Sequence, residues 1–150
     1  MKKFLFLVVL IVGSVTWANG SEKIDFDQRA KQLFLSQPFV AIDRVAKIPS
    51  NFAECLRTNR MTKMAEPDKP FQVGCDGDGS LPLVRLILAG YSGKYFFISY
   101  ERGGRAHLFK LDFFRIDKNK SVLIGTFSPG PKKFKSIEEI KTAVKELESN

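Results

Sequence analysis

Four apolar runs in the second half of the chain dominate its hydrophobic pattern. They cover residues 83–89, 94–102, 106–116 and 121–127 and are rich in Leu, Ile, Val, Phe and Tyr. Short segments containing Gly, Ser, Asp or Asn separate them, and these residues are typical of reverse turns. Because such short connections join only antiparallel neighbours, the pattern predicts a four-stranded antiparallel meander. The run 94–102 is apolar on both faces, which is typical of a central strand covered on both sides.

Helical periodicity occurs at both ends of the chain. Near the start, Asp25 and Gln28 have the spacing of a capping box, and an apolar stripe follows until the residues before Pro38. Near the end, Ser136 and Glu139 have the same spacing, and a second apolar stripe follows them. We expect both terminal helices to pack on the sheet.

The pattern is weaker between the first helix and the meander. The segment 39–48 is partly β-branched and predicts one more strand, and Ser50 opens a short helix that ends near Thr58. The residues that follow, up to Ser80, read as a long loop. The predicted fold class is therefore α+β, a four-stranded or five-stranded antiparallel meander with N- and C-terminal helices packed on the sheet.

Residues 1–18 have the pattern of a secretory signal peptide. Two lysines precede the apolar run 4–12, and small residues lead from it to Ala18. The alternative is an uncleaved anchor, but a run this short spans about 14 Å as a helix, against a bilayer core of ~30 Å. We therefore predict cleavage between Ala18 and Asn19, with export to the periplasm or out of the cell. Residues 19–150 would form a single compact domain without a transmembrane segment.

Export changes how the two cysteines, Cys55 and Cys75, are interpreted. An oxidising compartment favours a disulfide between them. It would close a loop of about 20 residues, which stabilises a fold by about 3 kcal/mol in the chain-entropy model. A catalytic thiol and a metal site are the alternatives, and the lack of a CxxC motif and the single histidine disfavour both. The pattern therefore predicts one structural disulfide.

Few residue patterns point to catalysis or to a cofactor. His107 is the only histidine, which excludes zinc sites built from several histidines. The segment 76–80 has the spacing of the start of a calcium loop. The twelfth position from Asp76 must then supply a bidentate Glu, but it is Ile87, inside a predicted strand. We therefore predict no catalytic residue, no metal and no cofactor.

The positive charge of the chain is dispersed. The formal net charge is +8, and it becomes +6 if the two lysines of the signal peptide are removed. Basic residues flank the diglycine turn 103–104, and others lie in the loop 56–74. Because loops on a rigid scaffold often carry binding residues, they form the candidate binding surface. Its members are Arg57, Arg60, Arg102, Arg105 and His107.

The leading hypothesis is an exported, non-enzymatic binding protein that acts through a protein–protein surface, as an inhibitor or an immunity protein does. Its partner is then another protein. The first alternative is a binder of anionic polymers or of the envelope surface, driven by net positive charge, with an affinity that falls with salt. The second alternative is a small hydrolase whose catalytic residues are too dispersed to recognise in the sequence.

Overall fold

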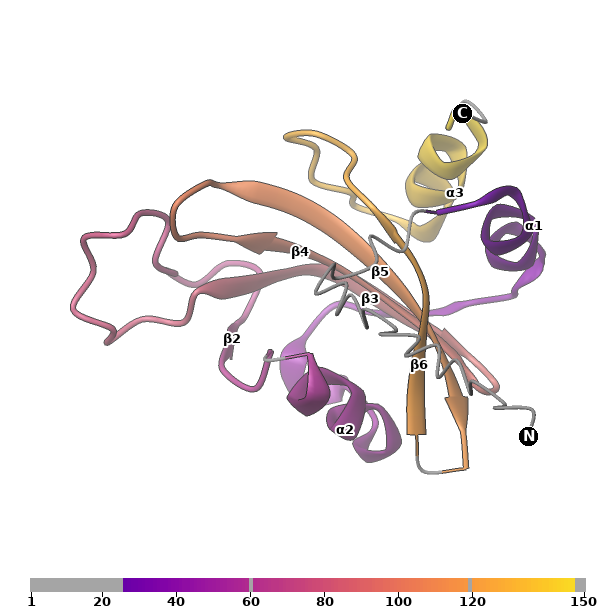
Figure 1. The fold of residues 1–150 in the computed structure, drawn as a ribbon, viewed down its shortest axis with the longest axis horizontal. Coiled ribbons are helices and arrows are strands. Elements are labelled where there is room, and N and C mark those ends of the chain that lie inside the picture. The colour runs from indigo at the N-terminus through magenta and orange to yellow at the C-terminus, as the bar shows by residue number, and fades with distance from the viewer. Residues whose placement is uncertain (1–25, 60, 119, 148–150) are drawn as a thin grey trace, which may run out of the picture.

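A six-stranded sheet forms the centre of the molecule (Figure 1). The computed structural model describes residues 26–59, 61–118 and 120–147. The strands are β1 (Val40–Ile42), β2 (Met64–Ala65), β3 (Val84–Ser92), β4 (Tyr95–Arg102), β5 (Leu108–Asp117) and β6 (Lys120–Phe127). Their order is β1-β3-β4-β5-β6 with antiparallel neighbours, and β2 pairs in parallel with the start of β3.

The predicted α+β class and the antiparallel meander are confirmed. Strands β3 to β6 begin within two residues of the four apolar runs, β3 continues three residues beyond its run, and each strand pairs with the next along the chain. β4 is the central strand, and all of its residues from Phe96 to Glu101 are buried. A strand covered on both faces needs apolar residues at successive positions, as the sequence of this run indicates.

Helices cover both faces of the sheet. They are α1 (Gln28–Ser36), α2 (Ser50–Thr58) and α3 (Ile137–Lys145), and a 3-10 turn, η1 (Val45–Lys47), precedes α2. α1 and α3 lie together on one face and α2 lies on the other (Figure 1). The Ser136 hydroxyl caps α3 by accepting from the Glu139 backbone N–H, as predicted. α1 is capped by Asp27, which accepts from Ala30 N–H; the predicted cap Asp25 lies outside the described residues.

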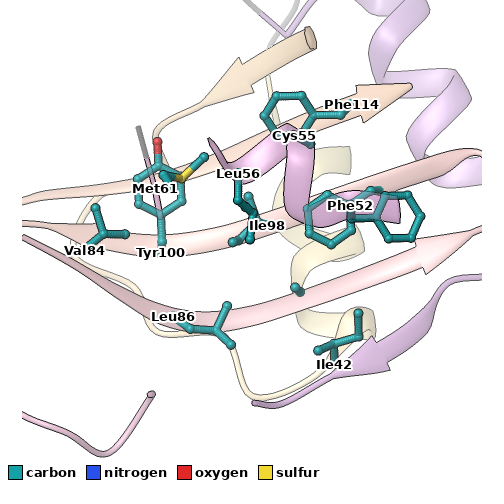
Figure 2. Packing of buried hydrophobic residues seen from close by; sticks show 12 residues of the cluster. Ile42, Phe52, Cys55, Leu56, Met61, Val84, Leu86, Ile98, Tyr100 and Phe114 are labelled. Carbon is teal, nitrogen blue, oxygen red and sulfur yellow. The ribbon is translucent and has the colours of Figure 1, made fainter. Parts of the chain in front are cut away.

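Aromatic and branched side chains fill both interfaces between helices and sheet. On the α2 face, Phe52 stacks on Phe96 with ring centroids 4.6 Å apart. Phe52 and Leu56 of α2 belong to the same cluster as Ile98 of β4 (Figure 2). On the other face, Phe34 of α1 meets Phe97 and Phe113 edge to face at centroid distances of 5.4 and 5.2 Å. Such pairs stabilise a core beyond the burial of their area. The two clusters make the sheet a rigid support for its loops.

A buried carboxylate, Asp112, lies on the α2 face of β5. Its oxygens accept hydrogen bonds from the hydroxyls of Tyr100 and Thr126, both at 2.8 Å. Burial raises the pKa of Asp112, although both hydrogen bonds act in the opposite direction. The group is therefore held by neutral donors alone, without an ion pair among the described residues.

The structure does not support the predicted disulfide, since Cys55 and Cys75 are both free thiols. Cys55 faces the sheet from α2, and burial raises the pKa of its thiol to about 12. After α2 the chain pairs with the edge of β3 as β2, a two-residue strand that the sequence did not reveal. It then continues to an exposed segment that contains Cys75. The two sulfurs therefore belong to different environments, one in the core and one at the surface.

Candidate functional site

One end of the sheet is built from the turn between β4 and β5 together with a long loop. We call residues 71–83 and 102–108 the hairpin end. Gly103 N–H donates to the Leu83 carbonyl and Gly104 N–H donates to the Val73 carbonyl, both at 2.9 Å. Gln72 N–H donates to the Pro82 carbonyl, also at 2.9 Å, and so closes the base of the loop. Backbone hydrogen bonds therefore fix the loop to the turn.

Gly103 is required by this junction because two backbones approach each other closely there. A Cβ at position 103 would collide with the carbonyl oxygen of Gln72 and lie 2.8 Å from the Cα of Val73. Gly104 has φ of 115°, a conformation that other residues rarely adopt. The diglycine pair thus serves both the turn and the contact with the loop.

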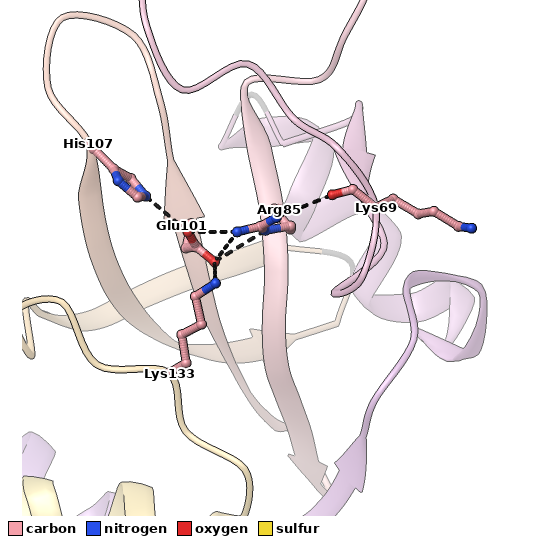
Figure 3. A network of polar contacts seen from close by, with 5 residues as sticks. All are labelled: Lys69, Arg85, Glu101, His107 and Lys133. Atoms are coloured by element: carbon pink, nitrogen blue, oxygen red, sulfur yellow. Dashed lines mark hydrogen bonds and ion pairs between the residues drawn. The ribbon is translucent and has the colours of Figure 1, made fainter.

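A cluster of charged residues lies beside this junction, on the α1 and α3 side of the sheet (Figure 3). At its centre is Glu101, which is 1 % exposed. Arg85 donates to both carboxylate oxygens at 2.8 and 3.0 Å, His107 Nε2 lies 2.9 Å from Oε2, and Lys133 Nζ lies 3.1 Å from Oε1. Side chains from β3, from the turn before β5 and from the loop before α3 therefore meet at one carboxylate of β4.

Aromatic packing completes this cluster. Phe71 is buried, and the Arg85 guanidinium lies over its ring, 4.3 Å from the centroid. The His107 ring lies between Phe71 and Phe109, at centroid distances of 5.8 and 4.9 Å. Arg85 also donates to the Lys69 carbonyl at 3.4 Å (Figure 3). The carboxylate and the buried ring together hold the loop against the sheet.

The electrostatics of Glu101 follow from these contacts. Burial alone would raise its pKa, but hydrogen bonds donated by Arg85, Lys133 and His107 outweigh burial and hold the pKa below its usual value. The pair of His107 and Glu101 has the geometry that orients an imidazole as a general base. Among the described residues, no hydroxyl or thiol forms a hydrogen bond to His107.

A groove of about 380 Å³ lies on the opposite, α2 side of the hairpin end. It is lined by Thr62 and Lys63, which follow α2, and by Leu81 and Leu83 of the loop. Arg102 and the buried Val84 also line it, and these two residues are cross-strand partners on β4 and β3. The groove therefore combines two cationic side chains with an apolar lining.

Exposed apolar side chains are concentrated at the hairpin end. Among the described residues, six large apolar residues are exposed, and four of them lie here. Leu108 is the cross-strand partner of Arg102, so it continues the surface of the groove onto β5. The four residues are Val73, Leu81, Leu83 and Leu108, which are 43–46 % exposed. Exposed apolar side chains that gather at one end of a sheet are typical of interaction sites.

The structure separates the residues that the sequence grouped as one candidate surface. Arg102 lines the groove, whereas His107 lies on the other face of the sheet with Glu101. Arg105 is exposed in the turn between them. Arg57 lies on α2, where its guanidinium forms an ion pair with Glu54, and Arg60 lies outside the described residues.

Sequence reasoning missed Glu101 and the two leucines of the groove, whereas Lys63 belongs to the basic loop 56–74 that it included in the candidate surface. Glu101 could have been noticed, because it is a charged residue within a run that is otherwise mostly apolar, and a buried charge needs partners. No pattern along the chain could have paired Lys63 with Arg102, since the two residues belong to elements brought together only by the sheet.

Comparisons of the chain with family models, with curated proteins and with solved structures gave no match. Within residues 26–59, 61–118 and 120–147, no group of His, Cys, Asp and Glu side chains is arranged to hold a metal ion. In that same part of the chain, no helix has both the length and the hydropathy needed to cross a membrane. Function must therefore be inferred from the hairpin end itself.

Proposed function

We propose that this chain is an exported binding protein that recognises another protein through its hairpin end and does not catalyse a reaction. The observation that carries the proposal is the concentration of exposed apolar residues at that end, beside Arg102 and Arg105. Apolar area gives affinity and arginine is enriched at protein interfaces, so this composition favours a protein partner. The pattern of residues 1–18 supports export.

The rigidity of the hairpin end also supports a binding role. Backbone hydrogen bonds fix the loop to the diglycine turn, and the Glu101 cluster fixes the adjacent strands and loop. A surface that is ordered before binding loses less conformational entropy on association. An inhibitor or immunity protein gains affinity from this preorganisation.

The test begins with the protein expressed with its own residues 1–18 in the host. Mass spectrometry of the purified product should find Asn19 as the first residue if the chain is exported and cleaved. The purified protein is then immobilised and exposed to envelope and culture-fluid extracts of the host, with washes at low and high salt. We expect one protein to be retained at high salt in a stoichiometric amount.

Two double variants make this result specific for the hairpin end. Arg102→Glu with Arg105→Glu should abolish retention, because each change reverses a charge at the proposed surface. Lys94→Glu with Lys120→Glu makes the same change in charge at the opposite end of the sheet, where both lysines are exposed, and should leave retention unchanged. Equal retention by both variants would refute the placement. A mixture of acidic molecules released by salt would instead favour the polyanion binder.

A hydrolase is the second candidate, and the observation that favours it is the contact between His107 and Glu101. A buried carboxylate 2.9 Å from Nε2 orients the imidazole. Turnover of an ester or amide substrate that persists through purification and is lost in His107→Gln would support this candidate. Turnover unchanged in that variant would come from a contaminant.

A further inference from the structure

We infer that the groove at the hairpin end binds an acidic side chain of the partner, presented on an extended segment with apolar neighbours. This inference rests on the proposed function and names the chemistry of its partner. Two cationic side chains, Lys63 and Arg102, line the groove from different elements. Leu81 and Leu83 line the same groove and are each 44 % exposed.

The charges of the groove have no acidic counterpart within it. None of the residues that line it is an aspartate or a glutamate. Among the described residues, neither Lys63 nor Arg102 forms an ion pair. Lys63 and Arg102 line the same groove, so an incoming carboxylate could accept charge-assisted hydrogen bonds from both side chains. The groove is therefore complementary to a negative group.

The size and surroundings of the groove favour a protein segment over an anionic polymer. A volume of about 380 Å³ accommodates one or two side chains. Leu108 continues the apolar surface beside Arg102, and apolar neighbours of the carboxylate could pack there. A polyanion has no apolar side chains to place on these leucines, and it would be recognised by a row of cations on an open surface.

The direct test uses peptides of defined chemistry. The first probe is an acetylated and amidated heptapeptide in which leucines alternate with aspartate and glutamate. The second has asparagine and glutamine at the acidic positions, and the third probe is inorganic polyphosphate. Binding is measured by NMR titration of the ¹⁵N-labelled protein, which also locates the site from the shifted amides.

We expect the acidic peptide to bind about tenfold or more tightly than its amide counterpart, since charge-assisted hydrogen bonds are the stronger class. The shifted amides should be those of Lys63, Leu83, Arg102 and their neighbours. Lys63→Glu should weaken binding by about tenfold or more, because a like charge then faces the ligand. Lys120→Glu, the same change at the opposite end of the sheet, should have no effect.

Three results would overturn the inference. They are equal binding of the two peptides, shifts located outside the groove, and competition by polyphosphate that is unaffected by Lys63→Glu. The partner captured on the immobilised protein separates this inference from the proposed function. If Arg105→Glu abolishes its capture while Lys63→Glu does not, the hairpin end is the binding surface and the groove is not its acidic subsite. If neither variant affects capture, the proposed function fails as well.

Discussion

Glu101 and Asp112 are both buried carboxylates, and they are stabilised in opposite ways. Glu101 faces the α1 and α3 side of β4 and is surrounded by Arg85, His107 and Lys133. Asp112 faces the α2 side of β5 and receives hydrogen bonds from two neutral hydroxyls. The pKa of Glu101 is consequently lowered and that of Asp112 is raised. The partners of a buried carboxylate therefore decide the sign of its shift.

The difference matches the tasks of the two regions. The partners of Asp112, Tyr100 and Thr126, lie on the strands next to β5, so this network supports only the sheet. Two of the partners of Glu101, His107 and Lys133, come from loops, and Arg85 also reaches the buried Phe71. The Glu101 network therefore holds loops in place, and these loops include the hairpin end. In this protein the charged contacts of Glu101 join separate segments of the chain, whereas the neutral hydrogen bonds of Asp112 join neighbouring strands.

The largest effect is expected from Glu101→Gln, which removes the negative charge that Arg85, Lys133 and His107 contact. Breaking a buried ion pair by removing one partner costs about 3–5 kcal/mol, and we expect a loss near the lower limit because Lys133 is largely exposed. Urea unfolding followed by circular dichroism measures the free energy of unfolding. Asp76→Asn in the exposed loop is the control, and it should change that free energy by less than about 0.5 kcal/mol.

The same variant should also change the dependence of stability on pH. The pKa of Glu101 is lowered from 4.5 in the folded protein, so its contribution is present above pH 4.5 and is lost as the pH falls through the folded value. The difference between wild type and Glu101→Gln should therefore shrink in acid. A difference in unfolding free energy that stays constant as the pH falls below 4.5 would show that folding does not lower the pKa of Glu101.

Tyr100→Phe should have the next largest effect, because it removes one of the two donors to Asp112. Leaving the carboxylate with one buried donor should cost about 1–3 kcal/mol of unfolding free energy. Combination with Asp112→Asn tests the cause in a double-mutant cycle. The loss should be smaller in the Asp112→Asn background, since a neutral amide needs the hydroxyl less. Additive losses would mean that Tyr100 contributes through packing alone.

Asp112→Asn alone should have a small effect at neutral pH, within about 1 kcal/mol, because it removes a charge that burial disfavours. Its pH dependence should oppose that of Glu101→Gln. The folded pKa of Asp112 is raised above 3.8, so its contribution is present below pH 3.8 and is lost as the pH rises through the folded value. The variant should therefore gain stability relative to wild type over that rise. A relative loss would show that the carboxylate is the favoured form in the core.

Lys133→Met should have the smallest effect, less than about 1 kcal/mol, because the lysine side chain is 57 % exposed and Arg85 and His107 remain at Glu101. High salt should reduce this effect further, since exposed pairs are screened. Thermal unfolding at low and high salt measures both. A loss as large as that of Glu101→Gln would show that Lys133 is as important to the cluster as the carboxylate.

Local patterns in the sequence predicted most of the fold. Alternation and turn residues act over a few positions, so the runs 83–89 and 121–127 gave strands β3 and β6 within one or two residues of their starts. The capping box at Ser136 and Glu139 likewise placed α3. β2 was missed because its pairing depends on the edge of β3 and on no signal of its own. The disulfide was predicted from the expected oxidising compartment and from the presence of two cysteines. Neither argument says where Cys55 and Cys75 lie in the fold.

The candidate site could be predicted only in part. Arg102 and Arg105 were recognised from their place beside the diglycine turn, and the structure puts them at the hairpin end. Their grouping with His107 in one binding surface stays a prediction, and the structure places Arg102 and His107 on opposite faces of the sheet. Neighbouring residues in a strand alternate between its faces, so Arg102 lies on the groove side of β4, whereas Glu101 lies on the other side, where His107 contacts it.

The sequence by itself determined the three helices and the antiparallel meander of β3 to β6, because these depend on periodicity and on short connections. The tertiary structure decided which charges meet. Lys63 joins Arg102 at one groove, and Lys133 joins Glu101 at one cluster, although many residues separate the members of each pair. The physical reason is that long-range contacts form only after the sheet and helices have packed, and they depend on which loops then lie side by side.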